Sequence, residues 1–369
     1  MRGISKLAHE LGLSTGTVSR ALNNVPGVHE KTRRRVLEAA QRLGYEPNQA
    51  ARNLALGQTR SVGFMIDLDP DTAANGDNFF MGVFDGVQSV LTPLGLDLFV
   101  LPCPSKQHRF AFLDRLVARR LVDGMILSGT EQSDPRIELL QSSGLPFATL
   151  GRSKSAVPFA WVDLDFEAVA ESAVDRLVGQ GHRRIAVTVP FGDLNFGLVF
   201  KAAYKKALAK HRIPYDPEIV FQSGFGEEDG YFLVDAMLDN PKPVTAIVLI
   251  FEAAAIGMYR RLEERGLRPG ADLAIIGFRD EAIVRYLRPR LTRFEVSLRD
   301  VGIALANALV DQIDAKGEPG HRPAQVKVPM TLLPGDSDGG TASLARSGED
   351  QPARPGGKRR NSAMARQPQ

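Results

Sequence analysis

The sequence contains very little cysteine: Cys103 is the only one in 369 residues. No disulfide can therefore form within the chain, and a reducing compartment is expected. No apolar run approaches the ~20 residues that a membrane-spanning helix needs, and the N-terminus carries no signal-peptide pattern. These absences predict a cytoplasmic protein without a membrane partner.

The sequence also lacks the motifs of the common enzyme classes. It has no phosphate-binding glycine loop, no cluster of metal-ligating residues and no nucleophile placed beside a base. We therefore expect a protein that is not an enzyme and needs neither a cofactor nor a metal.

Charge is unevenly distributed along the chain. Residues 1–60 hold 10 Lys+Arg against 4 Asp+Glu, whereas residues 61–334 hold 30 against 35. A basic head on an acidic body is typical of a module that binds a polyanion fused to a different domain. The remaining residues, 335–369, are rich in Gly, Ser, Pro and Arg without periodicity, which predicts a disordered basic tail.

The head has the pattern of three short helices. The first has one apolar stripe and is broken by Gly12, and Ser14 is a good cap for a second helix over 15–23. Turn residues follow at 24–27, and a third helix ends near Gly44. Two helices joined by a three-residue turn form a helix-turn-helix unit. The stripes of the first and third helices are Ile4, Leu7, Ala8 and Leu11, and Val36, Ala39, Ala40 and Leu43.

Pro47 ends the head, and residues 49–56 can form a helix that is only marginally stable alone. From Ser61 onward, apolar strands alternate with amphipathic helices such as 166–178 and 253–265. Strands that are apolar throughout and separated by helices predict parallel sheets covered on both faces. So many units over this length predict two doubly wound lobes. The candidate strands are 62–66, 96–101, 124–127, 146–150, 185–189, 246–250 and 273–276.

These segments carry motifs that resemble the LacI/GalR repressors from residue 3 to about 333. The motifs are Leu7-Ala8, Leu13-Ser14, Thr17-Val18-Ser19-Arg20-Ala21-Leu22-Asn23, Lys31-Thr32-Arg33, Gly44-Tyr45, Pro47-Asn48, Ala50-Ala51-Arg52, Leu54-Ala55, Asp123-Gly124-Met125-Ile126, Gly181-His182-Arg183-Arg184-Ile185-Ala186 and Ile276-Gly277-Phe278.

The resemblance implies an N-terminal helix-turn-helix head followed by an α/β core like the periplasmic sugar-binding proteins. It divides the chain into a DNA-binding domain (1–45), a hinge helix and linker (46–60), a bilobed effector-binding and dimerisation domain (61–334) and the tail (335–369). It also implies a homodimer on a palindromic operator. Tetramers of the family need a C-terminal leucine heptad, but the tail has one leucine, Leu344.

The resemblance further implies which head residues meet double-stranded DNA. The second helix would enter the major groove, where Arg20 can donate two hydrogen bonds to guanine. The hinge leucine would wedge into the minor groove and kink the duplex. The expected contacts are Thr15, Gly16, Thr17 and Arg20 in the major groove; Ser14, Ser19, Asn23, Thr32 and Tyr45 on phosphates; and Asn48, Ala51 and Leu54 at the hinge. Gly3 and His29 stand where the family usually has capping residues of another type.

A small effector, expected to be a sugar, would bind between the lobes, because loops at the carboxyl ends of parallel strands form ligand sites. Relatives use an Arg, an Asn-Asp pair and an Asp where this chain has Leu198, Phe251-Glu252 and Arg279. The effector is therefore expected to differ from that of the founding members. The candidate residues are Asn78, Phe79, Arg152, Asn195, Phe196, Phe225, Glu252, Arg279 and Asp280.

Other classes of protein fit less well. A secreted sugar-binding protein would carry a signal peptide instead of a helix-turn-helix, and an architectural DNA-bending protein would not need the sensor lobes. The sequence predicts a repressor of a carbohydrate uptake or catabolism operon. An activator, or a corepressor-dependent regulator that responds to a non-sugar metabolite, is the alternative left open.

Overall fold

The computed structural model describes residues 3–22, 26–43, 45, 59–67, 78–103, 108–224, 226–315 and 320–339. The hinge residues Asn48, Ala51 and Leu54 lie outside these ranges, as do Asn23 and Phe225. No helix in the described ranges has the length and apolar character needed to cross a membrane.

The head contains the three predicted helices, α1 (Ile4–Leu11), α2 (Thr15–Leu22) and α3 (Glu30–Arg42). Gly12 ends α1 in the left-handed conformation with φ of 65°, where a residue without Cβ is favoured. The stripes expected from spacing meet in one small core, with Leu7, Val18 and Val36 almost fully buried. The helical head is therefore confirmed.

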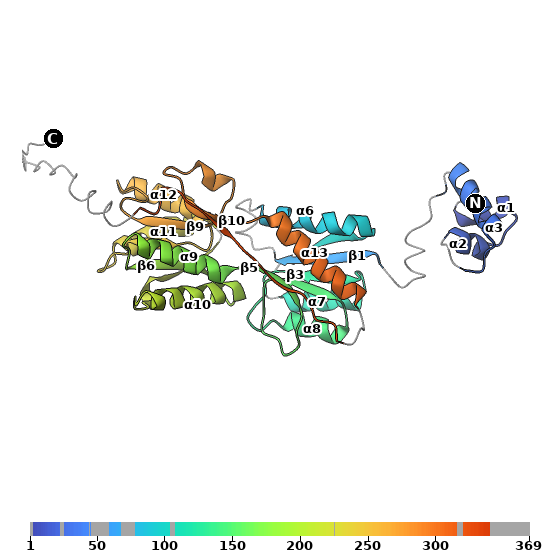
Figure 1. The fold of residues 1–369 in the computed structure, drawn as a ribbon, viewed down its shortest axis with the longest axis horizontal. Helices are drawn as coiled ribbons and strands as arrows, with labels where there is room; N and C mark the ends of the chain where they lie inside the picture. The colour runs from blue at the N-terminus through green and yellow to red at the C-terminus, as the bar shows by residue number, and fades with distance from the viewer. Residues whose placement is uncertain are drawn as a thin grey trace, which may run out of the picture.

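The rest of the described chain forms two lobes, each built on a six-stranded sheet (Figure 1). The sheet of the N-terminal lobe is parallel throughout, and the sheet of the C-terminal lobe is parallel except for its last strand. In order across the sheet, the N-terminal strands are β11 (Gln325–Val328), β5 (Ala160–Leu164), β4 (Phe147–Leu150), β3 (Gly124–Leu127), β1 (Ser61–Asp67) and β2 (Asp97–Cys103). The C-terminal strands are β12 (Thr331–Leu333), β10 (Thr292–Glu295), β9 (Ala274–Arg279), β8 (Ala246–Val248), β6 (Ile185–Pro190) and β7 (Val220–Ser223).

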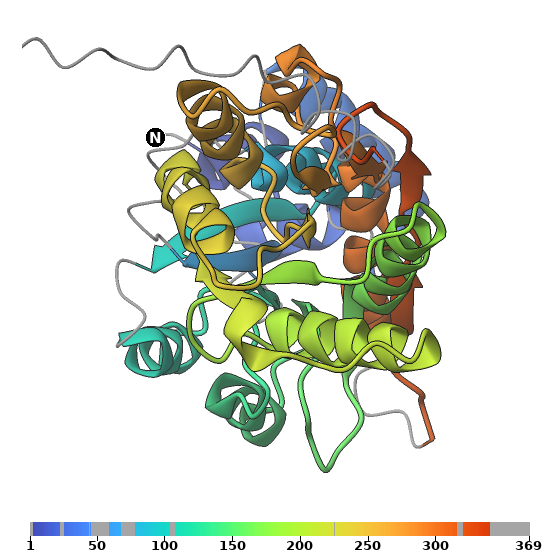
Figure 2. The same cartoon turned by 90° about the vertical axis from the view of Figure 1, so that its left-hand side faces the viewer.

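Helices cover both faces of each sheet, which is why the central strands are buried along their whole length. Figure 2 shows α9 and α10 on one side of the C-terminal sheet and α11 and α12 on the other. The helices of the N-terminal lobe are α6 (Phe79–Leu91), α7 (Arg109–Ala118), α8 (Pro135–Ser143) and α13 (Leu298–Asp314). Those of the C-terminal lobe are α9 (Phe166–Gly179), α10 (Asn195–Lys210), α11 (Glu227–Leu238) and α12 (Ala254–Glu264). The two doubly wound lobes are confirmed.

The chain passes between the lobes three times in the described ranges, after β5, β10 and β11. Two crossings begin a helix at once: the Asp165 side chain caps α9, and the Ser297 side chain caps α13. α13 returns to the N-terminal lobe and packs along α6 (Figure 1). These three connections lie side by side and form the waist of the molecule.

The structure corrects the start of the predicted tail. Residues 335–339 pack into the C-terminal lobe, where Ser337 and Asp338 are buried. The Ser337 hydroxyl donates to the Ile275 carbonyl at 2.6 Å, and the Asp338 carboxylate accepts from Thr292 Oγ1 at 2.6 Å and pairs with Arg176. Polar side chains make these contacts, and residues 335–339 have no apolar periodicity. The sequence pattern therefore did not reveal them.

Candidate functional site

The exposed start of α2 is the candidate DNA-reading surface. Val18 and Ala21 face the head core, which leaves Thr15, Gly16 and Arg20 exposed on the opposite side. Arg20 lies back along its own helix, and its Nε donates to the Gly16 carbonyl at 3.3 Å. Three of the four residues that the sequence assigned to the major groove therefore share one open face, and Thr17 does not.

The cap of α2 uses two residues that were also expected at the DNA. Ser14 Oγ accepts from the Thr17 backbone N–H at 3.0 Å and hydrogen-bonds Thr17 Oγ1 at 2.9 Å. Thr17 is half-buried and stabilises the helix start in this way. His29 caps α3 by accepting from the Lys31 N–H at 3.3 Å, so this departure from the family pattern preserves the cap.

The remaining phosphate candidates in the described ranges are Ser19, Thr32 and Tyr45, and all three are half-buried. The Tyr45 ring packs against the head core, and its backbone N–H donates to the Ala40 carbonyl at 2.9 Å. This packing anchors the end of the head.

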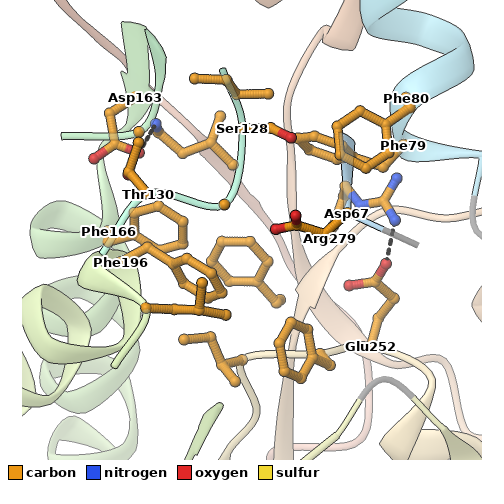
Figure 3. A pocket seen from close by; sticks show the side chains of 18 of the residues that line it. Asp67, Phe79, Phe80, Ser128, Thr130, Asp163, Phe166, Phe196, Glu252 and Arg279 are labelled. Carbon is orange, nitrogen blue, oxygen red and sulfur yellow. Dashed lines mark hydrogen bonds and ion pairs between the residues drawn. The ribbon is translucent and has the colours of Figure 1, made fainter. Parts of the chain in front are cut away.

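A cavity of about 210 Å³ lies between the lobes, at the carboxyl ends of their strands (Figure 3). Both lobes contribute side chains to its wall. Four of the candidates from sequence line it: Phe79, Phe196, Glu252 and Arg279. The side chains that sequence reasoning missed include six polar or charged residues and four phenylalanines: Asp67, Arg109, Ser128, Thr130, Asp163, Glu281, Phe80, Phe166, Phe251 and Phe278.

Arg279 and Glu252 form a buried ion pair of 2.5 Å in the C-terminal wall, drawn as a dashed line in Figure 3. The Arg279 guanidinium also lies 5.3 Å from the centre of the Phe79 ring, which belongs to the other lobe. A cation over an aromatic face is attracted by the ring quadrupole. Arg279 thus connects the two walls of the cavity.

On the opposite wall, Asp67 and Arg109 form a second ion pair of 3.0 Å. Nη1 of Arg109 also donates to the Gly129 carbonyl at 3.3 Å and to Glu131 at 3.1 Å. Asp67 is the last residue of β1, so the strand-end rule could have predicted it, whereas Arg109 begins a helix and carried no such signal.

Four of the described candidates, Asn78, Arg152, Asn195 and Asp280, do not line the cavity. Asn78 precedes α6, and Asp280 bonds Arg285 and Arg293. Burial by itself would raise the pKa of Asp280, but hydrogen bonds from these two arginines outweigh it and lower the pKa. Asn195 joins the lobes: its backbone N–H donates to the Thr130 carbonyl at 2.9 Å and its side chain to the Arg152 carbonyl at 2.8 Å.

Arg152 connects the lobes beside the cavity. Its Nε donates to Asp163 at 2.8 Å, and its two terminal nitrogens grip both oxygens of Glu167, in the first turn of α9, at 2.7 and 2.8 Å. Trp161 lies against the same guanidinium at 5.5 Å. Burial raises the pKa of Asp163 to about 6, although Arg152 acts in the opposite direction.

Asp163 should make the stability of the fold depend on pH. Its pKa is higher in the folded chain than the ordinary value of 3.8, so between these values the folded state holds a proton that the unfolded state lacks. The contribution of Asp163 to the free energy of unfolding is therefore full below pH 3.8 and is lost as the pH rises towards about 6. As the pH rises through that interval, the free energy of unfolding of Asp163→Asn should rise relative to that of wild type. Urea unfolding measures both. A pH-independent difference between Asp163→Asn and wild type would contradict the assignment.

Comparison with known proteins agrees with this architecture. Residues 4–48 match the model of bacterial regulatory proteins of the lacI family, and residues 174–337 match a periplasmic binding protein-like domain. The transcriptional regulator AglR of Rhizobium meliloti is 33% identical over 322 residues, which cover 85% of this chain and 89% of AglR. The chain belongs to the LacI family.

Other LacI-family regulators are similar over most of their length. CelR of Thermobifida fusca is 29% identical over 82% of this chain and 89% of its own. The structure of a CelR–cellobiose complex matches with a TM-score of 0.67 at 25% identity, covering 91% of this chain and 100% of that one. A lac repressor dimer bound to operator and the anti-inducer ONPF shares the fold, with a TM-score of 0.74 at 23% identity over 90% of this chain and 97% of that one.

The protein is therefore a DNA-binding LacI-family transcriptional regulator and not an enzyme. Regulators of the LacI family bind DNA and a small-molecule effector.

Arg20→Ala tests the reading role of α2. If the guanidinium donates to a guanine, the substitution should cost ~1–3 kcal/mol on the cognate operator and relax the preference at one symmetric pair of positions. Fluorescence anisotropy against operator and random duplexes measures both. Equal losses on the two duplexes would show instead that Arg20 contacts a phosphate.

Proposed function

We propose that the protein is a homodimeric repressor of a carbohydrate uptake or catabolism operon, and that a small sugar-like effector in the interlobe cavity controls its affinity for the operator. The observation that carries this proposal is the cavity itself, because each lobe supplies both charged and aromatic side chains to its wall. Its polar side chains suit hydroxyl groups, and its aromatic rings suit the C–H face of a sugar. The relatives AglR, CelR and RafR are regulators, and one CelR structure is a cellobiose complex.

The proposed coupling runs through the waist. Three adjacent connections allow the lobes to rotate as rigid bodies, as in other ligand-binding clefts. A ligand gripped by both walls favours one orientation, which sets the separation of the two hinge segments (46–60) in a dimer. We propose that Asn48, Ala51 and Leu54 of these segments contact the minor groove, while Thr15, Gly16, Thr17 and Arg20 read the major groove. Ser14, Ser19, Asn23, Thr32 and Tyr45 would contact phosphates.

The experiment begins with the full-length protein and an operator selected from random duplexes. Operator affinity is then measured with and without each member of a panel of neutral sugars. A sugar effector should change the affinity by ~5–150-fold, which corresponds to a coupling of ~1–3 kcal/mol. Two results would contradict this proposal: an effect of a non-sugar metabolite alone, or an effector that strengthens operator binding. Either would favour the alternative, an activator or a corepressor-dependent regulator that responds to a non-sugar metabolite.

Thr130→Val tests whether the cavity is the effector site. The change removes one hydroxyl from the wall but keeps the volume of the side chain. We expect the effector to bind about ten-fold more weakly, as for the loss of ~1.4 kcal/mol, while operator binding without effector is unchanged. Ser142→Ala, on the exposed face of α8, is the control. A normal effector response in Thr130→Val would place the site elsewhere.

A further inference from the structure

The two walls of the cavity differ in chemistry. The N-terminal lobe supplies most of its polar side chains, namely Asp67, Arg109, Ser128, Thr130 and Asp163. The N-terminal lobe also supplies four apolar side chains, but the C-terminal lobe supplies the larger apolar set: Phe166, Leu194, Phe196, Ile250, Phe251 and Phe278. Figure 3 shows Phe166 and Phe196 on the side of the cavity away from Phe79 and Phe80. A ligand that fits both walls must itself be amphipathic.

The N-terminal wall mainly accepts hydrogen bonds. Ser128 Oγ donates its proton to the Met65 carbonyl at 3.0 Å, and Thr130 Oγ1 donates to the Arg152 carbonyl at 2.9 Å. Each hydroxyl has one proton, so what remains for a ligand is the lone pairs of the oxygen. The carboxylates of Asp67 and Asp163 also accept. A ligand that carries several hydroxyl donors matches this wall.

The charge of the cavity disfavours an anion. Four carboxylates line the described wall (Asp67, Asp163, Glu252 and Glu281) against the guanidinium groups of Arg109 and Arg279. Both guanidinium groups already pair with carboxylates, Arg109 with Asp67 at 3.0 Å and Arg279 with Glu252 at 2.5 Å. An anionic ligand would have to compete with these pairs beside two further carboxylates. The hydroxylated ligand is therefore uncharged.

The apolar wall is larger than one sugar ring requires. Phe166 is stacked between Phe196 and Phe278, with ring centres 5.3 Å apart on each side, and Phe251 meets Phe196 edge to face at 6.2 Å. Of the charged groups of this lobe, Glu252 and Arg279 are paired with each other, and Glu281 lies 3.8 Å from Arg279. A flat apolar group that binds here would be stabilised by the burial of its apolar surface and by contact with the phenylalanine rings.

We propose that the effector is an uncharged glycoside whose sugar hydroxyls donate to the N-terminal wall and whose aromatic aglycone packs on the phenylalanines of the C-terminal wall. This inference rests on the proposed carbohydrate response and adds the class of carbohydrate. It assigns Phe251 and Phe196 as the residues that select the aglycone.

Matched pairs of ligands test the inference. The probes are methyl and phenyl glycosides of glucose and galactose in both anomeric forms, with methyl glucuronide and benzyl alcohol added. Isothermal titration calorimetry on the full-length protein measures their binding, and operator anisotropy measures their effect on DNA binding. For the sugar that binds, the phenyl glycoside should bind at least about ten-fold more tightly than the methyl glycoside, a difference of ~1.4 kcal/mol.

The variant Phe251→Ala should remove most of this preference and leave the affinity for the methyl glycoside nearly unchanged. Phe251 is half-buried in the loop after β8, so its truncation leaves the sheet intact. Phe232→Ala is the matched control, because this ring is 66% exposed on α11 and does not line the cavity. It should keep the full preference for the phenyl glycoside.

The outcomes separate this inference from the proposed function. If methyl and phenyl glycosides bind equally and both change operator affinity, the carbohydrate response stands and the aromatic aglycone is refuted. Tighter binding of methyl glucuronide than of methyl glucoside, or binding of benzyl alcohol as tight as that of the phenyl glycoside, also overturns the inference. If no glycoside binds or alters operator affinity, the carbohydrate response itself fails.

Discussion

Gly86→Val is expected to destabilise the N-terminal lobe severely. Gly86 on α6 faces Gly302 on α13, and the two helices approach so closely that a Cβ at Gly86 would overlap the Arg299 carbonyl oxygen. A Cβ at Gly302 would overlap the Val83 carbonyl in the same way. Because the obstructing atoms are backbone, no side chain can turn aside, and one helix must move.

Such overpacking costs ~1–3 kcal/mol in ordinary cores, and a backbone obstruction belongs at or above the top of this range. The movement would also displace the start of α6, where Phe79 and Phe80 line the cavity. We therefore expect Gly86→Val to lower the midpoint of urea unfolding and to weaken effector binding together. Gly86→Ala should show the same effects in weaker form.

Gly179→Ala is the control for this prediction. Gly179 is the last residue of α9, and a Cβ there would meet nothing within 4 Å. Alanine favours the helix over glycine by up to ~1 kcal/mol, so this variant should be as stable as wild type or more stable. If Gly86→Val unfolds at the same urea concentration as Gly179→Ala, the close approach of α6 and α13 does not matter for stability.

The parts of the fold that sequence predicted are those determined by local patterns. The stripe of α1 and the cap of α2 are encoded within a few residues, and the central strands are mostly apolar. The edge strand β11 is mostly exposed, and its residues carry no apolar run. β11 pairs with β5 in the N-terminal sheet and β12 pairs with β10 in the C-terminal sheet, and such long-range pairing leaves no local signal.

Part of the site could be predicted from one rule: residues at the carboxyl ends of neighbouring parallel strands lie close together. That rule identified Arg279 and Glu252, and applied to β1 and β3 it would also have identified Asp67 and Ser128. Asp163 lies in β5, a strand that the sequence did not predict. The rule could not predict which groups pair with one another. Asn195 contacts the other lobe instead of the cavity, because its partners, the Thr130 and Arg152 carbonyls, are brought to it only by the packing of one lobe against the other.

Arg152→Met is expected to have the second large effect on stability. The substitution keeps much of the side-chain volume but leaves the Asp163 carboxyl, whose side chain is 5% exposed, without its guanidinium partner. Removing one partner of a buried ion pair typically costs ~3–5 kcal/mol because the remaining charge is uncompensated. Glu167 is 39% exposed and keeps much of its contact with water, so Asp163 should account for most of the loss.

The double variant Arg152→Met/Asp163→Asn separates this cause from simple loss of packing. Asparagine has nearly the shape of the carboxyl but no charge to leave unpaired, so the double variant should recover much of the stability lost in Arg152→Met. Because Arg152 now holds the pKa of Asp163 down against burial, its removal should raise that pKa, and the deficit of the single variant should shrink as the pH falls. Urea unfolding at several pH values measures both effects. A double variant no more stable than Arg152→Met would show that the guanidinium acts through the lobe contact with Glu167 alone.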